Sequence, residues 1–212
     1  MLPEIQFTAK KYQPFFLSDI VSEVMHQLTS VEYRNAIYTR NIHRLHGVGL
    51  LKKSRSNTVI VYSKQGVFQI EKQYILDKLT HNIFAITHSN YYQPIKIINI
   101  YNDFIFEVFH KVHTVLSHVL TYLYQHLSHR TYGMQAIVDL DTVKSDFSLI
   151  ISELNCIECV LQDKNVSLDT TTLNHFSTVI NRLIKLGGAR SILPGNLMQF
   201  SYEFEMFKKI VG

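Results

Sequence analysis

Residues 41–62 read NIHRLHGVGLLKKSRSNTVIVY, and the interpretation of the N-terminal third of the chain depends on this stretch. It lies within residues 33–70, which carry seven Lys or Arg side chains and no Asp or Glu. A run with helical spacing stops at Gly47 and Gly49, and glycine best accepts the left-handed conformation that ends a helix. Two short β-prone runs follow, with the polar residues 54–57 between them. The pattern predicts a basic helix followed by a β-hairpin.

The helix is expected to span residues 31–46, because Thr29 and Glu32 form a capping-box pattern at its start. Helical periodicity then separates two faces. An apolar face would consist of Ile37, Tyr38, Ile42 and Leu45. The opposite face carries Thr39, Arg40 and His43, with Arg44 on its flank.

The outward residues have the chemistry of a DNA-reading helix, since Arg pairs with guanine edges and Thr contacts thymine methyls or phosphates. Basic residues on a hairpin would bind neighbouring phosphates and fix the register on the duplex. We therefore expect base or nearby phosphate contacts from Thr39, Arg40, His43 and Arg44, and backbone contacts from Lys52, Lys53 and Arg55. The alternative is a solvated basic helix followed by an ordinary hairpin.

Residues 45–51 (LHGVGLL), followed by Lys53 and Asn57, resemble the end of the recognition helix and the wing in winged helix-turn-helix transcription factors. This residue pattern is similar to that of eukaryotic cell-cycle factors and of bacterial winged-helix regulators. The Arg-Arg pair with which the cell-cycle family reads bases is absent, because Asn35-Ala36 precede Ile37-Tyr38. The resemblance is therefore at the level of the superfamily, and it implies a winged-helix domain that binds double-stranded DNA.

Charge is distributed unevenly along the chain, which has a formal net charge of +4. Residues 1–72 hold ten Lys or Arg and five Asp or Glu, whereas the remaining residues hold eleven and twelve. This distribution is typical of a protein in which one part faces a polyanion and another part packs or dimerises. A hydrophobic content of 46% argues for a folded chain.

The rest of the chain is predicted to be mainly helical. Gly66–Ile70 is expected to add a third strand, and residues 71–85 a helix, before a linker over residues 88–94. Further helices are expected over residues 95–130, 140–163, 168–186 and 196–210, the third ending at Gly187-Gly188. The predicted fold is thus mainly α with a small β-hairpin: a winged-helix domain over residues 1–88 and an all-α dimerisation or effector domain over residues 89–212.

The most apolar stretch, residues 94–127, is interrupted by charged side chains, so we expect a buried helix and no membrane partner. No signal peptide is apparent and there are two cysteines, which favours an intracellular protein. It would lie in the cytoplasm or nucleoid of a bacterium, or in the nucleus of a eukaryote.

Motifs for catalysis or cofactor binding are few. No nucleophile elbow, phosphate-binding glycine loop or zinc-protease motif occurs. Cys156 and Cys159 form a single CxxC, which we expect to consist of buried packing cysteines. The alternative is a four-ligand metal site, in which His110 and His113, which share a helix face, would join the two cysteines. The sequence therefore predicts no catalytic residue, no metal and no cofactor.

These observations predict a sequence-specific DNA-binding transcriptional regulator that is not an enzyme, acting as a dimer or higher homo-oligomer through its helical C-terminal domain. One alternative is a winged-helix interaction or scaffolding protein of a chromosome-segregation or assembly complex, with weak or no specific DNA binding. Another is a regulator with a ligand cavity in its helical domain.

Overall fold

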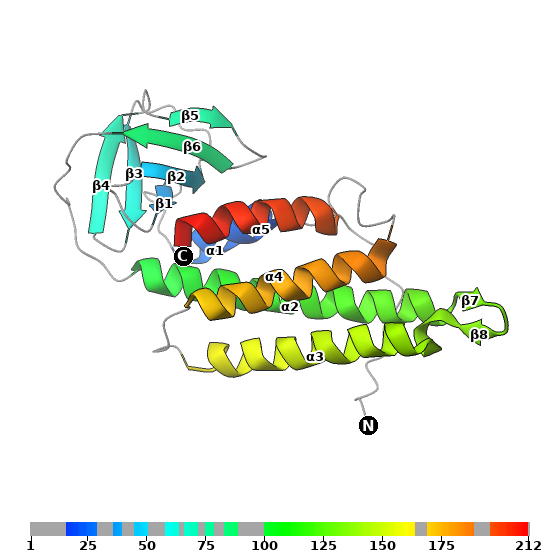
Figure 1. The fold of residues 1–212 in the computed structure, drawn as a ribbon. Coiled ribbons are helices and arrows are strands. Elements are labelled where there is room, and N and C mark those ends of the chain that lie inside the picture. Colours follow the sequence, from blue (N-terminus) through cyan, green and yellow to red (C-terminus); the bar gives the residue numbers. More distant parts are fainter. Residues whose placement is uncertain are drawn as a thin grey trace.

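A computed structural model describes residues 16–28, 36–39, 45–50, 58–63, 66–71, 75–78, 83–88, 100–163, 169–188 and 196–211, with side chains described mainly in the helical part. Six strands lie to one side of a group of long helices (Figure 1). The helices are α1 (Leu17–Leu28), α2 (Ile100–Ser128), α3 (Asp141–Leu161), α4 (Thr170–Gly187) and α5 (Leu197–Val211). The strands are β1 (Ala36–Thr39), β2 (Leu45–Leu50), β3 (Thr58–Ser63), β4 (Gly66–Glu71), β5 (Ile75–Lys78) and β6 (Ile83–His88).

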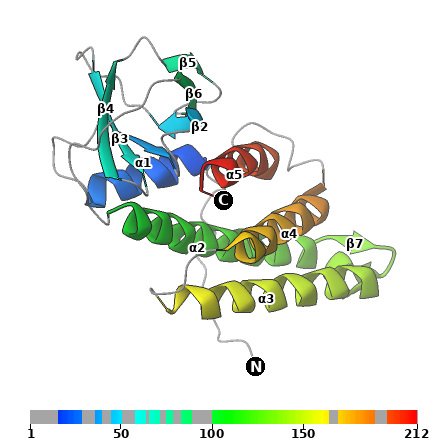
Figure 2. The same cartoon turned by 60° about the vertical axis from the view of Figure 1, so that its left-hand side comes forward.

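The six strands form two three-stranded sheets. In the first, β3 lies between β1 and β4; it pairs in parallel with β1 and antiparallel with β4. In the second, β6 lies between β2 and β5 and is antiparallel to both. Contacts of β1 and β2 with α5, and of β2 with α1, join the strands to the helices. As Figure 2 shows, α1 and α5 lie between the strands and the rest of the helical group.

The predicted N-terminal helix over residues 31–46 is wrong. Ala36–Thr39 is a strand, with Ile37 opposite Val61 in β3, and Gly47 and Gly49 lie inside β2. The physical reason is visible in the composition of β1: Ile, Tyr and Thr follow one another, and β-branched and aromatic side chains favour extended backbone. The glycines therefore do not end a helix.

The predicted hairpin is also wrong in its pairing. Residues 48–50 and 58–62 are in strands as expected, but these strands belong to different sheets, since β2 pairs with β6 and β3 with β1 and β4. The expected third strand is confirmed as β4. The expected helix over residues 71–85 is wrong where the structure describes it, because β5 and the start of β6 occupy that stretch. A winged-helix domain is not shown, and the domain boundary at residue 88 stays a prediction.

The helical half of the chain follows its sequence pattern. The four helices expected after residue 94 are α2 to α5, and the Gly187-Gly188 stop is confirmed by the positive φ of Gly188. The coarse prediction of a mainly α-helical chain with a smaller β component is thus confirmed. A two-stranded hairpin, β7 (Thr131–Tyr132) and β8 (Gln135–Ala136), and a short 3-10 helix η4 (Ile137–Asp139) connect α2 to α3. No helix in the described part of the chain has the length and apolar character that a membrane span requires.

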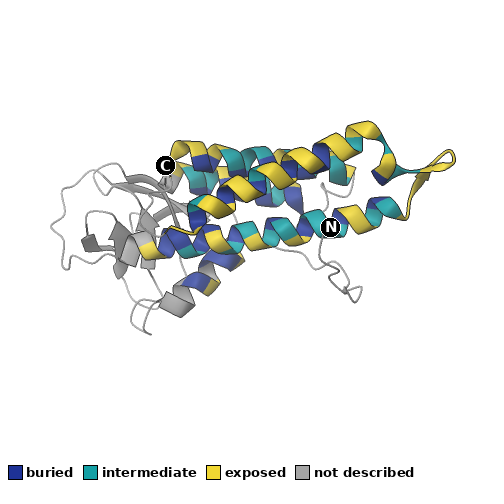
Figure 3. Ribbon diagram, turned by 90° about the horizontal axis from the view of Figure 1, so that it is seen from below, coloured by how far each residue is buried: buried dark blue, intermediate teal, exposed yellow. Residues whose placement is uncertain are grey.

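Helix α2 is the centre of the core, and it contacts α1, α3 and α4. Phe109 of α2 is fully buried, and its ring centroid lies 5.2 Å from Phe176 of α4 and 6.1 and 5.8 Å from Phe204 and Phe207 of α5. These four rings, here called the phenylalanine cluster, join three helices. Burial is confined to the faces that the helices turn toward one another (Figure 3).

Ion pairs connect the helices at the edge of this core. Asp146 of α3 is buried, with its Oδ1 2.9 Å from Nη1 of Arg182 and its Oδ2 2.7 Å from Nζ of Lys185, both on α4. The hydrogen bond from Lys185, helped by the positive charge of Arg182, holds the pKa of the Asp146 carboxyl below its ordinary value despite its burial. The carboxylate is therefore ionised and paired on both oxygens, which fixes α3 against α4.

Substitution Asp146→Asn is expected to lower the free energy of unfolding by about 1–3 kcal/mol near neutral pH, because one charged acceptor of two hydrogen bonds is lost. A lowered carboxyl pKa stabilises the folded state above the unfolded value near 3.8, and this contribution is lost as the pH falls through the folded value. Urea unfolding should therefore give a constant difference between wild type and variant from pH 7 to 5 that shrinks below pH 4.

Asp141→Asn, at the exposed start of the same helix, is the matched control, and it should cost clearly less. Equal losses in the two variants would contradict the role given to the Asp146 network.

Candidate functional site

A pocket of about 400 Å³ lies between α2 and the C-terminal end of α3. Four of its lining residues are on neighbouring turns of α2, which brings their side chains to one side of the helix. The other three come from the end of α3 and the residue that follows it. The lining residues are Phe106, Glu107, His110 and His113 from the first segment, and Glu158, Leu161 and Gln162 from the second.

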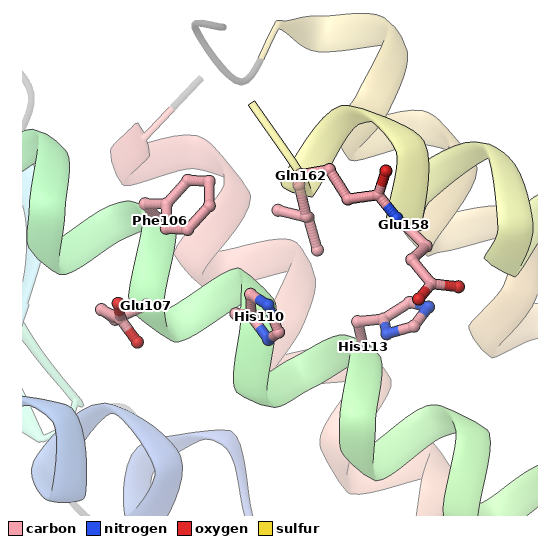
Figure 4. Close-up of a pocket in the computed structure, with 7 residues that line it drawn as sticks. Phe106, Glu107, His110, His113, Glu158 and Gln162 are labelled. Carbon is pink, nitrogen blue, oxygen red and sulfur yellow. The ribbon is translucent and has the colours of Figure 1, made fainter. Parts of the chain in front are cut away.

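The side chains are arranged along the pocket in a clear order (Figure 4). Phe106 and Glu107 lie at one end, His110 lies in the middle, and His113 and Glu158 lie at the other end. Phe106 and Leu161 are buried, whereas His110, Glu158 and Gln162 are exposed. The pocket therefore combines an apolar lining with a polar rim.

His113 is held in one orientation by α3. Its Nε2 lies 3.2 Å from the carbonyl oxygen of Leu154, and because a carbonyl oxygen only accepts, Nε2 carries the proton and donates it. Burial lowers the pKa of His113, an effect that the Leu154 hydrogen bond and the charge of Glu158 oppose and the neighbouring His110 reinforces. The imidazole is thus mainly neutral at pH 7, with Nδ1 as a hydrogen-bond acceptor.

The charge of the pocket is negative. Glu107 and Glu158 contribute two carboxylates, and among the described residues no Lys or Arg lines the pocket. Within the described residues, no group of three or more His, Cys, Asp or Glu side chains is placed to hold a metal ion. The site is suited to a hydrogen-bond donor or a cation, and not to an anion.

The structure places the predicted site residues elsewhere or does not describe them. Thr39 lies in β1, on a strand and not on a recognition helix. The remaining predicted DNA-contact residues lie outside the described residues: Arg40, His43, Arg44, Lys52, Lys53 and Arg55.

The prediction that the two CxxC cysteines are buried is wrong. Cys156 and Cys159 are both exposed free thiols on α3, so they are not packing cysteines, and neither lines the pocket. Glu158, which lies between them in the sequence, does line it. The His110/His113 spacing correctly indicated that two side chains share a helix face. It gave no indication that a carboxylate from α3 lines the same pocket, because that depends on how α2 and α3 pack.

Comparison with known proteins finds similar folds but no match by sequence. No protein-family model matches the chain, and no curated protein matches it. Solved structures of dehydrogenases do match. An FAD-dependent dehydrogenase is similar with a TM-score of 0.55 and 10% identity, over 92% of this chain and 76% of the other.

Two further structures give the same picture. A variant of the steroid ACAD Tcur3481-Tcur3483 is similar with a TM-score of 0.51 and 11% identity, over 84% of this chain. A protein from Mycobacterium abscessus assigned as an acyl-CoA dehydrogenase has a TM-score of 0.51 and 9% identity, over 89% of this chain and 68% of its own. The chain spans 58% of the length of the steroid ACAD.

This likeness corrects the functional predictions. Strands followed by long helices, arranged as in solved dehydrogenase structures, contradict the prediction of a DNA-binding transcriptional regulator. The resemblance to winged-helix proteins and the scaffolding alternative stay predictions. The prediction that the chain is not an enzyme is overturned as well, because the similar structures are dehydrogenases. Self-association through the helical part stays a prediction.

His113 generates a prediction for the pH dependence of stability. A folded-state pKa below the unfolded value of 6.5 means that the unfolded chain binds more protons in that interval, so stability falls as the pH is lowered through it and levels off above it. His113→Gln keeps an N–H donor for the Leu154 carbonyl but does not titrate. Thermal unfolding of the variant should lose less stability than wild type between pH 7 and pH 5. Identical pH profiles would show that His113 is not buried in its neutral form.

Proposed function

We propose that the chain is the strand-and-helix portion of a flavin-dependent oxidoreductase of the acyl-CoA dehydrogenase type. The observation that carries the proposal is the match to an FAD-dependent dehydrogenase over 92% of this chain at a TM-score of 0.55. The match runs through both the strands and the helices, since it covers nearly the whole chain. A second match, to the steroid ACAD, supports the same type of enzyme.

The pocket between α2 and α3 does not fit a flavin dinucleotide. The diphosphate of such a cofactor is anionic, and proteins bind diphosphates with backbone N–H groups at helix N-termini and with Arg or Lys side chains. This pocket offers two carboxylates and lies against the end of α3, the pole of a helix that repels anions. The proposal therefore assigns the flavin to no residue of this pocket, and no catalytic step is derived through it.

The proposal predicts that the purified chain binds FAD with one site per chain. Titration followed by flavin fluorescence should saturate, and ADP should compete because it carries the adenosine diphosphate half of the cofactor. Riboflavin, which lacks that half, should bind more weakly and serves as the matched control. A dye-reduction assay with acyl-CoA thioesters then tests turnover by the FAD-loaded protein. No saturable FAD binding, together with no thioester-dependent dye reduction, would contradict the proposal.

A further inference from the structure

The pocket between α2 and α3 has two hydrogen-bond acceptors at one end. His113 donates through Nε2 to Leu154, so its Nδ1 presents a lone pair. Glu158 is close enough for its charge to raise the pKa of His113. A carboxylate and an imidazole lone pair are both acceptors, so neither satisfies the other. A donor with more than one N–H, such as an ammonium group, satisfies both.

The other end of the pocket carries a second carboxylate. Glu107 and His113 are six residues apart on α2, which corresponds to about 9 Å along a helix. Between them the lining is formed by the buried side chains of Phe106 and Leu161 and by the imidazole of His110, whose ring centroid lies 6.1 Å from that of Phe106. Two anionic ends separated by an apolar and aromatic middle are thus a property of this one pocket (Figure 4).

We propose that this pocket binds a linear organic dication, a diammonium compound with a short hydrocarbon chain. One ammonium lies between Glu158 and Nδ1 of His113, the hydrocarbon passes along Phe106 and Leu161, and the second ammonium pairs with Glu107. The aromatic face of Phe106 adds attraction for a cation that is partly removed from water. An anion would face two carboxylates, and a bare metal ion lacks a set of three protein ligands among the described residues.

The ligand site goes beyond the proposed redox function and does not depend on it, because no flavin takes part in the binding. Isothermal titration calorimetry with 1,5-diaminopentane on the whole purified chain tests it directly. Four probes of similar length separate charge from shape: the diamine, pentylamine, 1,5-pentanediol and glutarate. The diamine should bind more tightly than pentylamine, and the diol and glutarate should show no saturable binding.

Two substitutions locate the site. Glu158→Gln and Glu107→Gln should each weaken diamine binding about three- to tenfold, because each removes one partly exposed ion pair. Glu158→Gln should also weaken pentylamine if the single ammonium chooses the His113 end. Asp141→Asn removes the same charge from the far end of α3 and is the matched control; it should change binding by less than twofold.

Several results would overturn the site. These are no saturable binding of the diamine, equal binding of the diol or glutarate, or an Asp141→Asn effect as large as that of Glu158→Gln. Unfolding curves of all three variants, recorded alongside, show whether a loss of binding is a loss of folding. If a glutamate variant is unstable, ¹H–¹³C spectra of the wild-type histidines provide the second readout, because the diamine should shift the His113 ring signals and glutarate should not.

Discussion

The phenylalanine cluster is the contact on which the arrangement of the helices depends. Phe109 lies on α2, and its ring meets Phe176 of α4 and both Phe204 and Phe207 of α5. Each aromatic side chain buries a large apolar area, and tilted or edge-on ring pairs add a smaller attraction of their own. Because α5 also contacts β1 and β2, the same cluster connects the strands to the helical core. Loss of this contact would weaken the attachment of α5, and of the strands that it contacts, to the rest of the core.

The position of the pocket follows from this packing. Since α2 turns Phe109 toward α4 and α5, the neighbouring face with His110 and His113 is turned toward α3. The Asp146 network with Arg182 and Lys185 then fixes α3 against α4, so the end of α3 is held beside that face. The lowered pKa of His113 and the two carboxylates that line the pocket are consequences of how α2 and α3 pack, and not of any local motif.

How far the sequence predicts this structure differs between its two halves. The helices after residue 94 could be predicted because their apolar residues recur at helical spacing and Gly187-Gly188 marks an end. The strands could not, because Ala36–Thr39 is short and pairs with residues of β3 that lie more than twenty positions away in the sequence. A basic run that ends in two glycines has the local pattern of a helix and its cap, so the sequence alone favours a helix there. Only part of the site could be predicted from the sequence. The spacing of His110 and His113 predicts that they share a helix face, whereas the place of Glu158 in the pocket depends on tertiary packing that no local pattern contains.

The central claim is that residues 36–88, where the structure describes them, form strands that pack on the helical core in a fold similar to that of an FAD-dependent dehydrogenase. Backbone NMR of the isotopically labelled chain tests this most directly at residues 36–39. The structure predicts extended-chain chemical shifts there and cross-strand NOEs between Ile37 and Val61 and between Tyr38 and Tyr62, from the parallel pairing of β1 with β3. Helical shifts with sequential i to i+3 NOEs through residues 31–46 would contradict the account and restore a helix in that position.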